Sequence, residues 1–204
     1  MSPTRRRILA AAVIIVAALS GAANAQASAT TRIRGTIASV EGATLTVTTR
    51  AGQTAVIALA DDLTVSSVKK LDLSALTDKA YVGMTTRTGA DGRMTAIEVH
   101  VFPEAARGAG EGSRPWDLEP NSTMTNGTIA GAVTATAGRE LTVTYKDGAK
   151  TIFVPPEVPI VTFVPAQRSD LKTGAQVFLT ATDNGGKLSA SRVTVGKDGV
   201  APPM

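Results

Sequence analysis

The sequence predicts an all-β protein: two tandem, small, OB-like antiparallel β-barrels related by internal duplication. Three observations predict this fold class. Apolar and polar residues alternate with a period of two along much of the chain, and β-branched residues are frequent there, which is typical of strands with one buried face. Two segments repeat each other at a spacing of about 95 residues. Neither copy contains a pattern long enough to predict a helix of ordinary length.

The N-terminus has the layout of an export signal. Arg5 to Arg7 precede an apolar run at 8–19, and the small residues of Ala23-Asn24-Ala25 follow it. We therefore expect a signal peptide at 1–25, cleaved after Ala25. The run is shorter than the roughly 20 residues of a membrane span, although an uncleaved anchor is the alternative. The arginine cluster is compatible with both the general secretory and the twin-arginine route.

Without the signal, the chain is close to electrically neutral. The net charge of the whole chain is +4, and the signal holds three arginines and no acidic residue, which leaves 18 basic against 17 acidic residues. An almost neutral chain with 3% aromatic residues argues against nucleic acid as a partner, because single-strand binding needs a basic groove and exposed aromatic rings. The chain has no Cys, so it has no disulfide and no thiolate metal site. Export without Cys favours the bacterial periplasm.

The duplication defines the predicted domains. Gly35-Thr36-Ile37-Ala38 is matched with 131–134, and Leu45–Thr48 with 141–144, both at a spacing of 96. Further on, 76–84 matches 171–179 at a spacing of 95. The predicted organisation is a first barrel at 26–102, a linker at 103–127, and a second barrel with a short tail at 128–204.

Each copy is expected to hold three strands, a break and a closing hairpin. In the first copy the predicted strands are 33–40, 44–49, 54–59, a short one near 63–65, 81–87 and 94–102. The turn at Asp147-Gly148 is a strong hairpin signal in the second copy. A glycine within the first strand marks the bend that lets one strand serve both sides of a small barrel. A pair of small sandwiches or roll-like sheets is the alternative.

Several motifs resemble those of a known group of proteins. They are Gly35–Gly42, Leu171–Val177, Glu98–Glu104, Gly112–Asp117 and Ser122–Asn126. Together they are similar to uncharacterised proteobacterial exported tandem β-domain proteins, which are often labelled metal ABC transporter permeases. A permease needs several membrane spans, and this sequence has no apolar stretch long enough after the signal. The resemblance therefore implies an exported β-domain protein and no transport activity.

The segment 103–127 is the candidate binding segment. It belongs to neither copy, and it contains the only Trp of the chain, Trp116, close to Arg114 and Asp117. In one interpretation Trp116 packs between the repeats while Arg114 and Asp117 cap the contact. In the other, the three residues form a clamp in which Trp116 stacks on a ligand and Arg114 holds an anion.

His100 is the candidate metal ligand. It shares one strand face with Glu98, because side chains two residues apart point to the same side of a strand. Glu104 follows closely in sequence, so His100, Glu98 and Glu104 are the predicted ligands of a transition metal, the only cofactor considered.

These observations predict a non-enzymatic, monomeric periplasmic protein. It would bind an envelope protein or a small periplasmic ligand through the groove between the repeats and the Trp116 segment. The alternative function is metal binding, or a response to metal stress, at a single site around His100. No nucleic acid and no membrane span after signal cleavage are expected.

Overall fold

The computed structural model describes residues 29–135 and 138–202, and it is built almost wholly from strands. The elements are β1 (Ala29–Glu41), β2 (Thr44–Thr49), β3 (Thr54–Leu71), β4 (Tyr81–Thr88), β5 (Met94–Val101), β6 (Gly112–Trp116), β7 (Ser122–Ala135), β8 (Gly138–Tyr145), β9 (Gly148–Val154), β10 (Ile160–Ala166), β11 (Gln176–Asp183) and β12 (Leu188–Val195), with three single 3-10 turns. Within these residues no helix has the length and apolar character to cross a membrane. The predicted signal at 1–25 lies outside the described residues.

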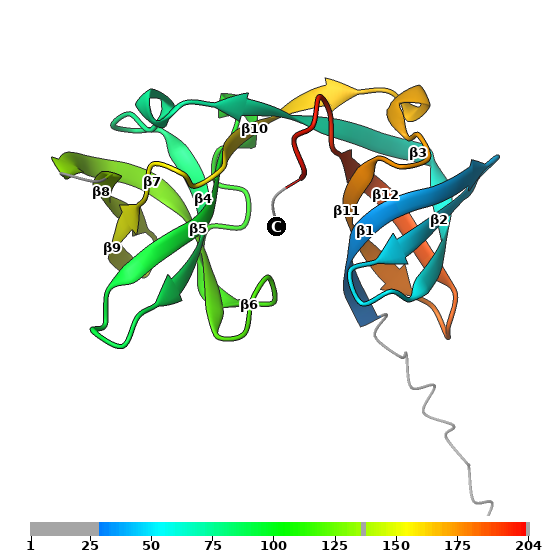
Figure 1. The fold of residues 1–204 in the computed structure, drawn as a ribbon, viewed down its shortest axis with the longest axis horizontal. Helices are drawn as coiled ribbons and strands as arrows, with labels where there is room; N and C mark the ends of the chain where they lie inside the picture. The colour runs from blue at the N-terminus through cyan, green and yellow to red at the C-terminus, as the bar shows by residue number, and fades with distance from the viewer. Residues whose placement is uncertain (1–28, 136–137, 203–204) are drawn as a thin grey trace, which may run out of the picture.

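The strands form two five-stranded barrels, which confirms the predicted all-β barrel fold (Figure 1). The first barrel closes in the order β1-β2-β3-β12-β11, and β11 returns to β1. The second closes in the order β7-β8-β9-β5-β4, and β4 returns to β7. In each barrel one neighbouring pair is parallel, β3 with β12 and β9 with β5. The alternative of two sandwiches is therefore wrong.

Each barrel combines strands from both repeats, so the predicted domain limits need correction. The ranges 26–102 and 128–204 do not close barrels of their own, because β4 and β5 of the first repeat belong to the second barrel. In exchange, β11 and β12 of the second repeat complete the first barrel. The cause lies in β3, which runs on as one 18-residue strand where two were predicted. This long strand carries the chain from one barrel to the other.

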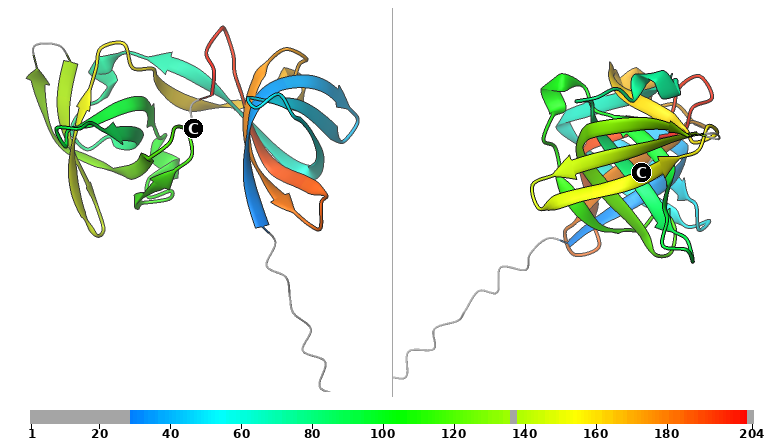
Figure 2. Two further views of the ribbon diagram at one scale, coloured as in Figure 1. Left: turned by 60° about the horizontal axis from the view of Figure 1, so that its bottom comes forward. Right: turned by 90° about the vertical axis from the view of Figure 1, so that its left-hand side faces the viewer.

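A two-stranded bridge relates the barrels by an approximate twofold axis. The second half of β3 pairs antiparallel with β10, and Val68 lies opposite Phe163. These residues are 95 positions apart, the spacing of the duplication, so equivalent residues of the two repeats face each other at the axis. Figures 1 and 2 show the bridge as the crossing ribbons that join the barrels.

The structure also corrects the alignment of the first strand. Ile37 pairs with Val47 just before a bulge in β1, and Ile129 pairs with Val143 just before the matching bulge in β7. The counterpart of Gly35-Thr36-Ile37-Ala38 is therefore the identical Gly127-Thr128-Ile129-Ala130, at a spacing of 92 rather than 96. Strands β7 and β8 pair over two further residues each than β1 and β2 do at this hairpin, which restores the spacing of 96 from the paired part of β8 onward. The predicted linker at 103–127 consequently includes β6 and the start of β7.

Two separate apolar cores fill the barrels. The first unites Ile37 and Leu45 from the first repeat with Leu179 and Val193 from the second, each no more than 1% exposed. Burying one such side chain stabilises the fold by about 1.5–3 kcal/mol. Because each core draws on both repeats, hydrophobic burial holds the repeats together.

Candidate functional site

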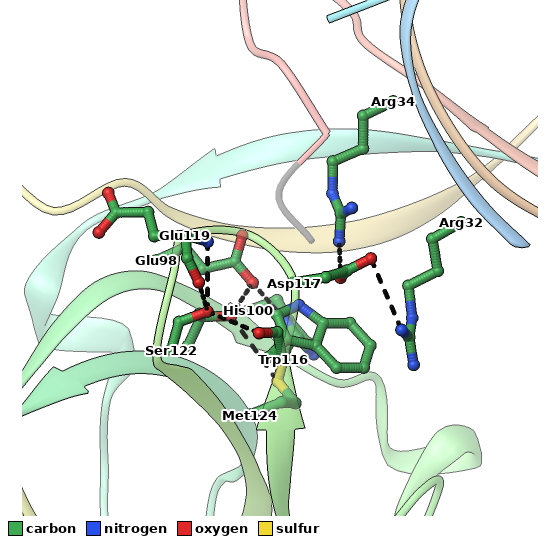
Figure 3. Close-up of polar contacts among 10 residues, drawn as sticks. Arg32, Arg34, Glu98, His100, Trp116, Asp117, Glu119, Ser122 and Met124 are labelled. Atoms are coloured by element: carbon green, nitrogen blue, oxygen red, sulfur yellow. Dashed lines mark hydrogen bonds and ion pairs between the residues drawn. The ribbon is translucent and has the colours of Figure 1, made fainter. Parts of the chain in front are cut away.

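The turn between β6 and β7 links the two barrels through a group of four residues that we call the clasp: Arg32, Arg34, Trp116 and Asp117. Arg34 Nη2 donates a hydrogen bond of 2.8 Å to Asp117 Oδ1, and Arg32 Nη1 lies 3.7 Å from Asp117 Oδ2. The Arg32 guanidinium also lies 3.9 Å from the centre of the Trp116 ring, a cation–π contact. Figure 3 shows both arginines reaching from β1 towards the turn.

Ser122 organises the turn that carries the clasp. Its Oγ lies 3.1 Å from the Trp116 carbonyl and 2.8 Å from the Glu119 carbonyl, so its single hydroxyl hydrogen is shared between them. The same Oγ accepts a hydrogen bond of 3.2 Å from the Glu119 amide. Asn121 takes a positive φ of 61°, which Asn tolerates better than most residues. These local bonds hold Trp116 and Asp117 towards β1.

The charge of Asp117 is stabilised in this position. Partial burial raises the pKa of its carboxyl group, but the hydrogen bond from Arg34 and the positive charges of Arg34 and Arg32 outweigh that effect and bring the pKa below its usual value. Asp117 is therefore an anion at neutral pH, and it is already paired. The clasp thus acts as a joint between the barrels.

The three predicted binding residues, Arg114, Trp116 and Asp117, lie close together, and Arg114 lies on the second-barrel side of the Trp116 ring. Arg114 Nη1 donates a hydrogen bond of 2.7 Å to the Gly110 carbonyl, and its guanidinium lies 5.5 Å from the centre of the Trp116 ring. The ring therefore contacts cations from both barrels. This geometry favours the interpretation of Trp116 as a packing residue between the repeats over that of a ligand clamp.

His100 lies in a buried layer on the outer face of the second barrel. It is 1% exposed, and its ring makes edge contacts with Phe102 and Phe163 at centroid distances of 4.7 and 5.4 Å. Gly83 on the neighbouring strand makes room for it, because a Cβ there would overlap His100 Nε2. Neither ring nitrogen has a hydrogen-bond partner among the described residues. Burial, and to a lesser extent the charge of Arg114, lower the pKa of His100 to about 3.

The three predicted metal ligands do not come together. His100 Nδ1 and Glu98 Oε1 lie 4.0 Å apart, as their shared strand face predicts, and Glu98 Oε1 also accepts a hydrogen bond of 2.7 Å from Thr85. Glu104 is exposed, and Arg107 bonds both of its carboxylate oxygens, at 2.6 and 2.8 Å. In the part of the chain that the structure describes, no group of three or more His, Asp or Glu side chains could hold a metal ion.

The buried histidine predicts a loss of stability in mild acid. An unfolded chain protonates His100 below its ordinary pKa of 6.5, whereas the folded protein does not until about pH 3, so stability falls as the pH drops through this window. Between pH 7 and pH 5 the free energy of unfolding should fall by about 2 kcal/mol, as measured by urea denaturation. His100→Gln should lose this dependence, because the chain has only one His. Equal pH dependence in both proteins would contradict the assignment.

Leu118, which follows the clasp residue Asp117, lines two cavities. The inter-barrel cavity has a volume of about 540 Å³ and lies between Ile97, Leu118, Pro159 and Val161 and the C-terminal segment 198–202. Arg50 and Lys70 line it, and neither makes an ion pair with any described residue. Its acidic lining residues are Glu98, bonded to Thr85, and Asp198. The second cavity, about 720 Å³, lies beside β1 and shares Arg50 and Leu118 with the first.

Sequence reasoning did not identify four of these basic residues. Arg32 and Arg34 alternate with the buried Ile33, so their common face was visible in the sequence, but their partner Asp117 lies 83 residues from Arg34. Arg50 follows β2 in a turn, and Lys70 stands beside Lys69, a basic pair of the kind that is typical of an ordinary solvated surface. Only the tertiary structure shows that these two cations line one cavity.

Comparisons with protein-family models, curated proteins and solved structures give no match to this chain.

Proposed function

We propose that the protein is a non-enzymatic binding protein that takes a small anionic amphiphile into the inter-barrel cavity. The observation that carries this proposal is the pairing of two cations, Arg50 and Lys70, with apolar walls supplied by both barrels. Ligand sites of a few hundred Å³ are typically apolar with a small number of placed polar groups. An acidic head group would meet the cations while an apolar body packs against Ile97, Leu118 and Val161.

Other features of the molecule support a non-enzymatic binding role. The bridge of β3 and β10 and the clasp hold the barrels from two directions, so the cavity is preformed and a ligand need not order it. His100, the only histidine of the chain, is not among the residues that line the cavity. Together with the predicted export signal, this favours a monomeric carrier or sensor in the periplasm. The geometry gives the metal-binding alternative less support, because His100 and Glu98 come together while Glu104 is paired with Arg107.

A charge-removal series tests this function. Isothermal titration with decanoate should show binding, whereas neutral decanol and short acetate should bind at least tenfold more weakly. Decanol lacks the negative charge that the two cations would bind, and acetate lacks the apolar chain. Arg50→Met combined with Lys70→Met should lower the affinity for decanoate more than tenfold.

Lys69→Met is the matched control, since Lys69 is the neighbour of Lys70 on β3 and does not line the cavity. It should leave the affinity unchanged. Equal affinities of the control and the double variant would contradict the proposed site, and an absence of decanoate binding would contradict the ligand class.

A further inference from the structure

The two copies differ in how they cover one edge of their first strand. In the second barrel, residues 122–126 of β7 pair with β6 on one side, and residues 123–126 also pair with β4 on the other. The β6 partner runs antiparallel, with Gly112 opposite Asn126 and Trp116 opposite Ser122. This stretch of β7 therefore has both backbone edges satisfied.

The equivalent stretch of the first barrel, residues 30–34 of β1, is paired on one side only. It pairs with β11, but pairing with β2 starts only at Gly35 opposite Thr49. No strand lies along the other edge of residues 30–34 within the described ranges 29–135 and 138–202. By the spacing of 92, this is the edge that β6 fills in the second barrel.

The backbone groups on this edge can be assigned from one hydrogen bond. The Arg50 amide donates to the Arg34 carbonyl at 3.0 Å, so the backbone of Arg34 points to the side on which β2 lies. Backbone groups of successive residues alternate between the two edges of a strand. The N–H and C=O groups of Arg32 and Thr30 therefore point to the same open side, where a sixth strand would receive them.

A groove runs along the open edge. The 720 Å³ cavity is lined by Thr31–Arg34 on one side and by Ala55, Val56 and Leu188 on the other. Val56 is 58% exposed, the one exposed large hydrophobic residue in the described part of the chain. Figure 1 shows the N-terminal half of β1 facing the gap between the barrels, with β6 across from it.

We propose that this β1 edge binds an extended segment of a partner protein as an added antiparallel strand, in the register that β6 adopts on β7. Strand addition gains affinity from main-chain hydrogen bonds and specificity from alternate side chains. The position equivalent to Arg114 would lie opposite Arg32. Arg32 and Arg34 place two positive charges against the single carboxylate of Asp117, so an acidic residue opposite Arg32 is favoured by cross-strand charge pairing. Its neighbours would point towards Ile33 and Leu188, where apolar side chains are favoured. The partner segment is thus an alternating acidic and apolar strand.

This inference does not depend on the proposed function. The β1 edge and the inter-barrel cavity share only Arg50 and Leu118 among their lining residues. Lys70 lines the inter-barrel cavity but not the groove along β1. Lys70→Met should therefore weaken decanoate binding and leave peptide binding at the edge within about twofold, so the failure of either idea can be told from the failure of the other.

The probe for the experiment is a labelled peptide derived from β6. It has the sequence of residues 111–117 with glutamate at the position of Arg114, and its binding is followed by fluorescence polarisation. We expect it to bind roughly fivefold more tightly than the unaltered peptide, because a repulsive cross-strand pair becomes attractive. Hydrogen exchange of the Arg32 amide should slow when the peptide is bound.

Two variants of Thr30 isolate the backbone contribution. Thr30→Pro removes the N–H that points to the open side and leaves the bonds to β11 intact, so it should weaken binding more than tenfold. Thr30→Ala keeps that N–H and should change the affinity less than twofold. If both variants bind equally, or if a peptide N-methylated on its β1-facing amides binds as well as the probe, the proposal is overturned. Self-association of the protein that Thr30→Pro abolishes would assign the edge to a second copy and would also overturn it.

Discussion

Replacing Thr30 and Thr182 with cysteine is expected to join the two repeats by a disulfide in nearly every molecule. The two residues lie directly opposite each other on β1 and β11. Because the backbone of Thr30 points away from β11, they form a non-hydrogen-bonded pair, whose Cα atoms lie about 4.5 Å apart, within the range that a disulfide accepts. The chain has no cysteine of its own, so any disulfide that forms must join the two introduced cysteines. This result would establish that the barrels exchange strands between repeats.

A second cysteine pair tests the opposite topology. Arg87 precedes Thr182 by 95 residues, so it would lie opposite residue 30 if each repeat closed its own barrel. Thr30→Cys with Arg87→Cys should therefore keep two free thiols, counted by maleimide labelling in the folded protein. For the first pair, a protease site inserted in the turn at 108–110 allows the chain to be cut, and the fragments should stay together on a non-reducing gel. Oxidation of the 30/87 pair instead of the 30/182 pair would refute the exchange.

Alanine at Gly127 is expected to destabilise the protein as strongly as alanine at Gly35. A Cβ at Gly35 would overlap the Thr48 carbonyl, and a Cβ at Gly127 would overlap the Thr144 carbonyl. These neighbours are backbone atoms of the adjoining strand, so the strands must move apart rather than a side chain rotate. We expect a loss of about 3 kcal/mol or more in the free energy of unfolding for either variant, measured by urea denaturation.

Gly131→Ala is the matched control, and it also decides between the two alignments of the repeats. Gly131 lies four residues further along the same strand, and a Cβ there would meet no atom within 4 Å. Its substitution should change the free energy of unfolding by less than about 1 kcal/mol. A large loss at Gly131 with a small one at Gly127 would favour the spacing of 96 and contradict the structural alignment.

Much of the local structure was predictable because strand patterning is a local property. The alternation around Leu45, Val47, Leu141 and Val143 predicts which side chains face a core, and all four are fully buried. The unusual composition around Trp116 indicated either a contact between the repeats or a ligand clamp, and in the structure Arg32 of the other barrel lies 3.9 Å from the centre of the Trp116 ring. The shared face of His100 and Glu98 followed from their spacing of two.

The partners of these elements were not predictable in the same way. Two nearly equivalent sets of strands allow each barrel to close with either copy of the final hairpin, because the same apolar faces are buried in both cases. The outcome depends on whether the chain turns back near Asp61 and Asp62 or continues straight through β3, as it does. The topology therefore depends on the apolar surface buried and the strand pairs formed in the whole molecule. The bridge of β3 with β10 and the Asp117–Arg34 contact contribute to that sum.

The sequence by itself thus determined the strands, their buried faces and the duplication, since these follow from periodicity within short windows. Only the tertiary structure decided which repeat completes which barrel, which cations gather at the inter-barrel cavity, and which edge of β1 stays open. These features depend on contacts between residues far apart in the chain, and no local pattern records which of two similar partners a strand takes.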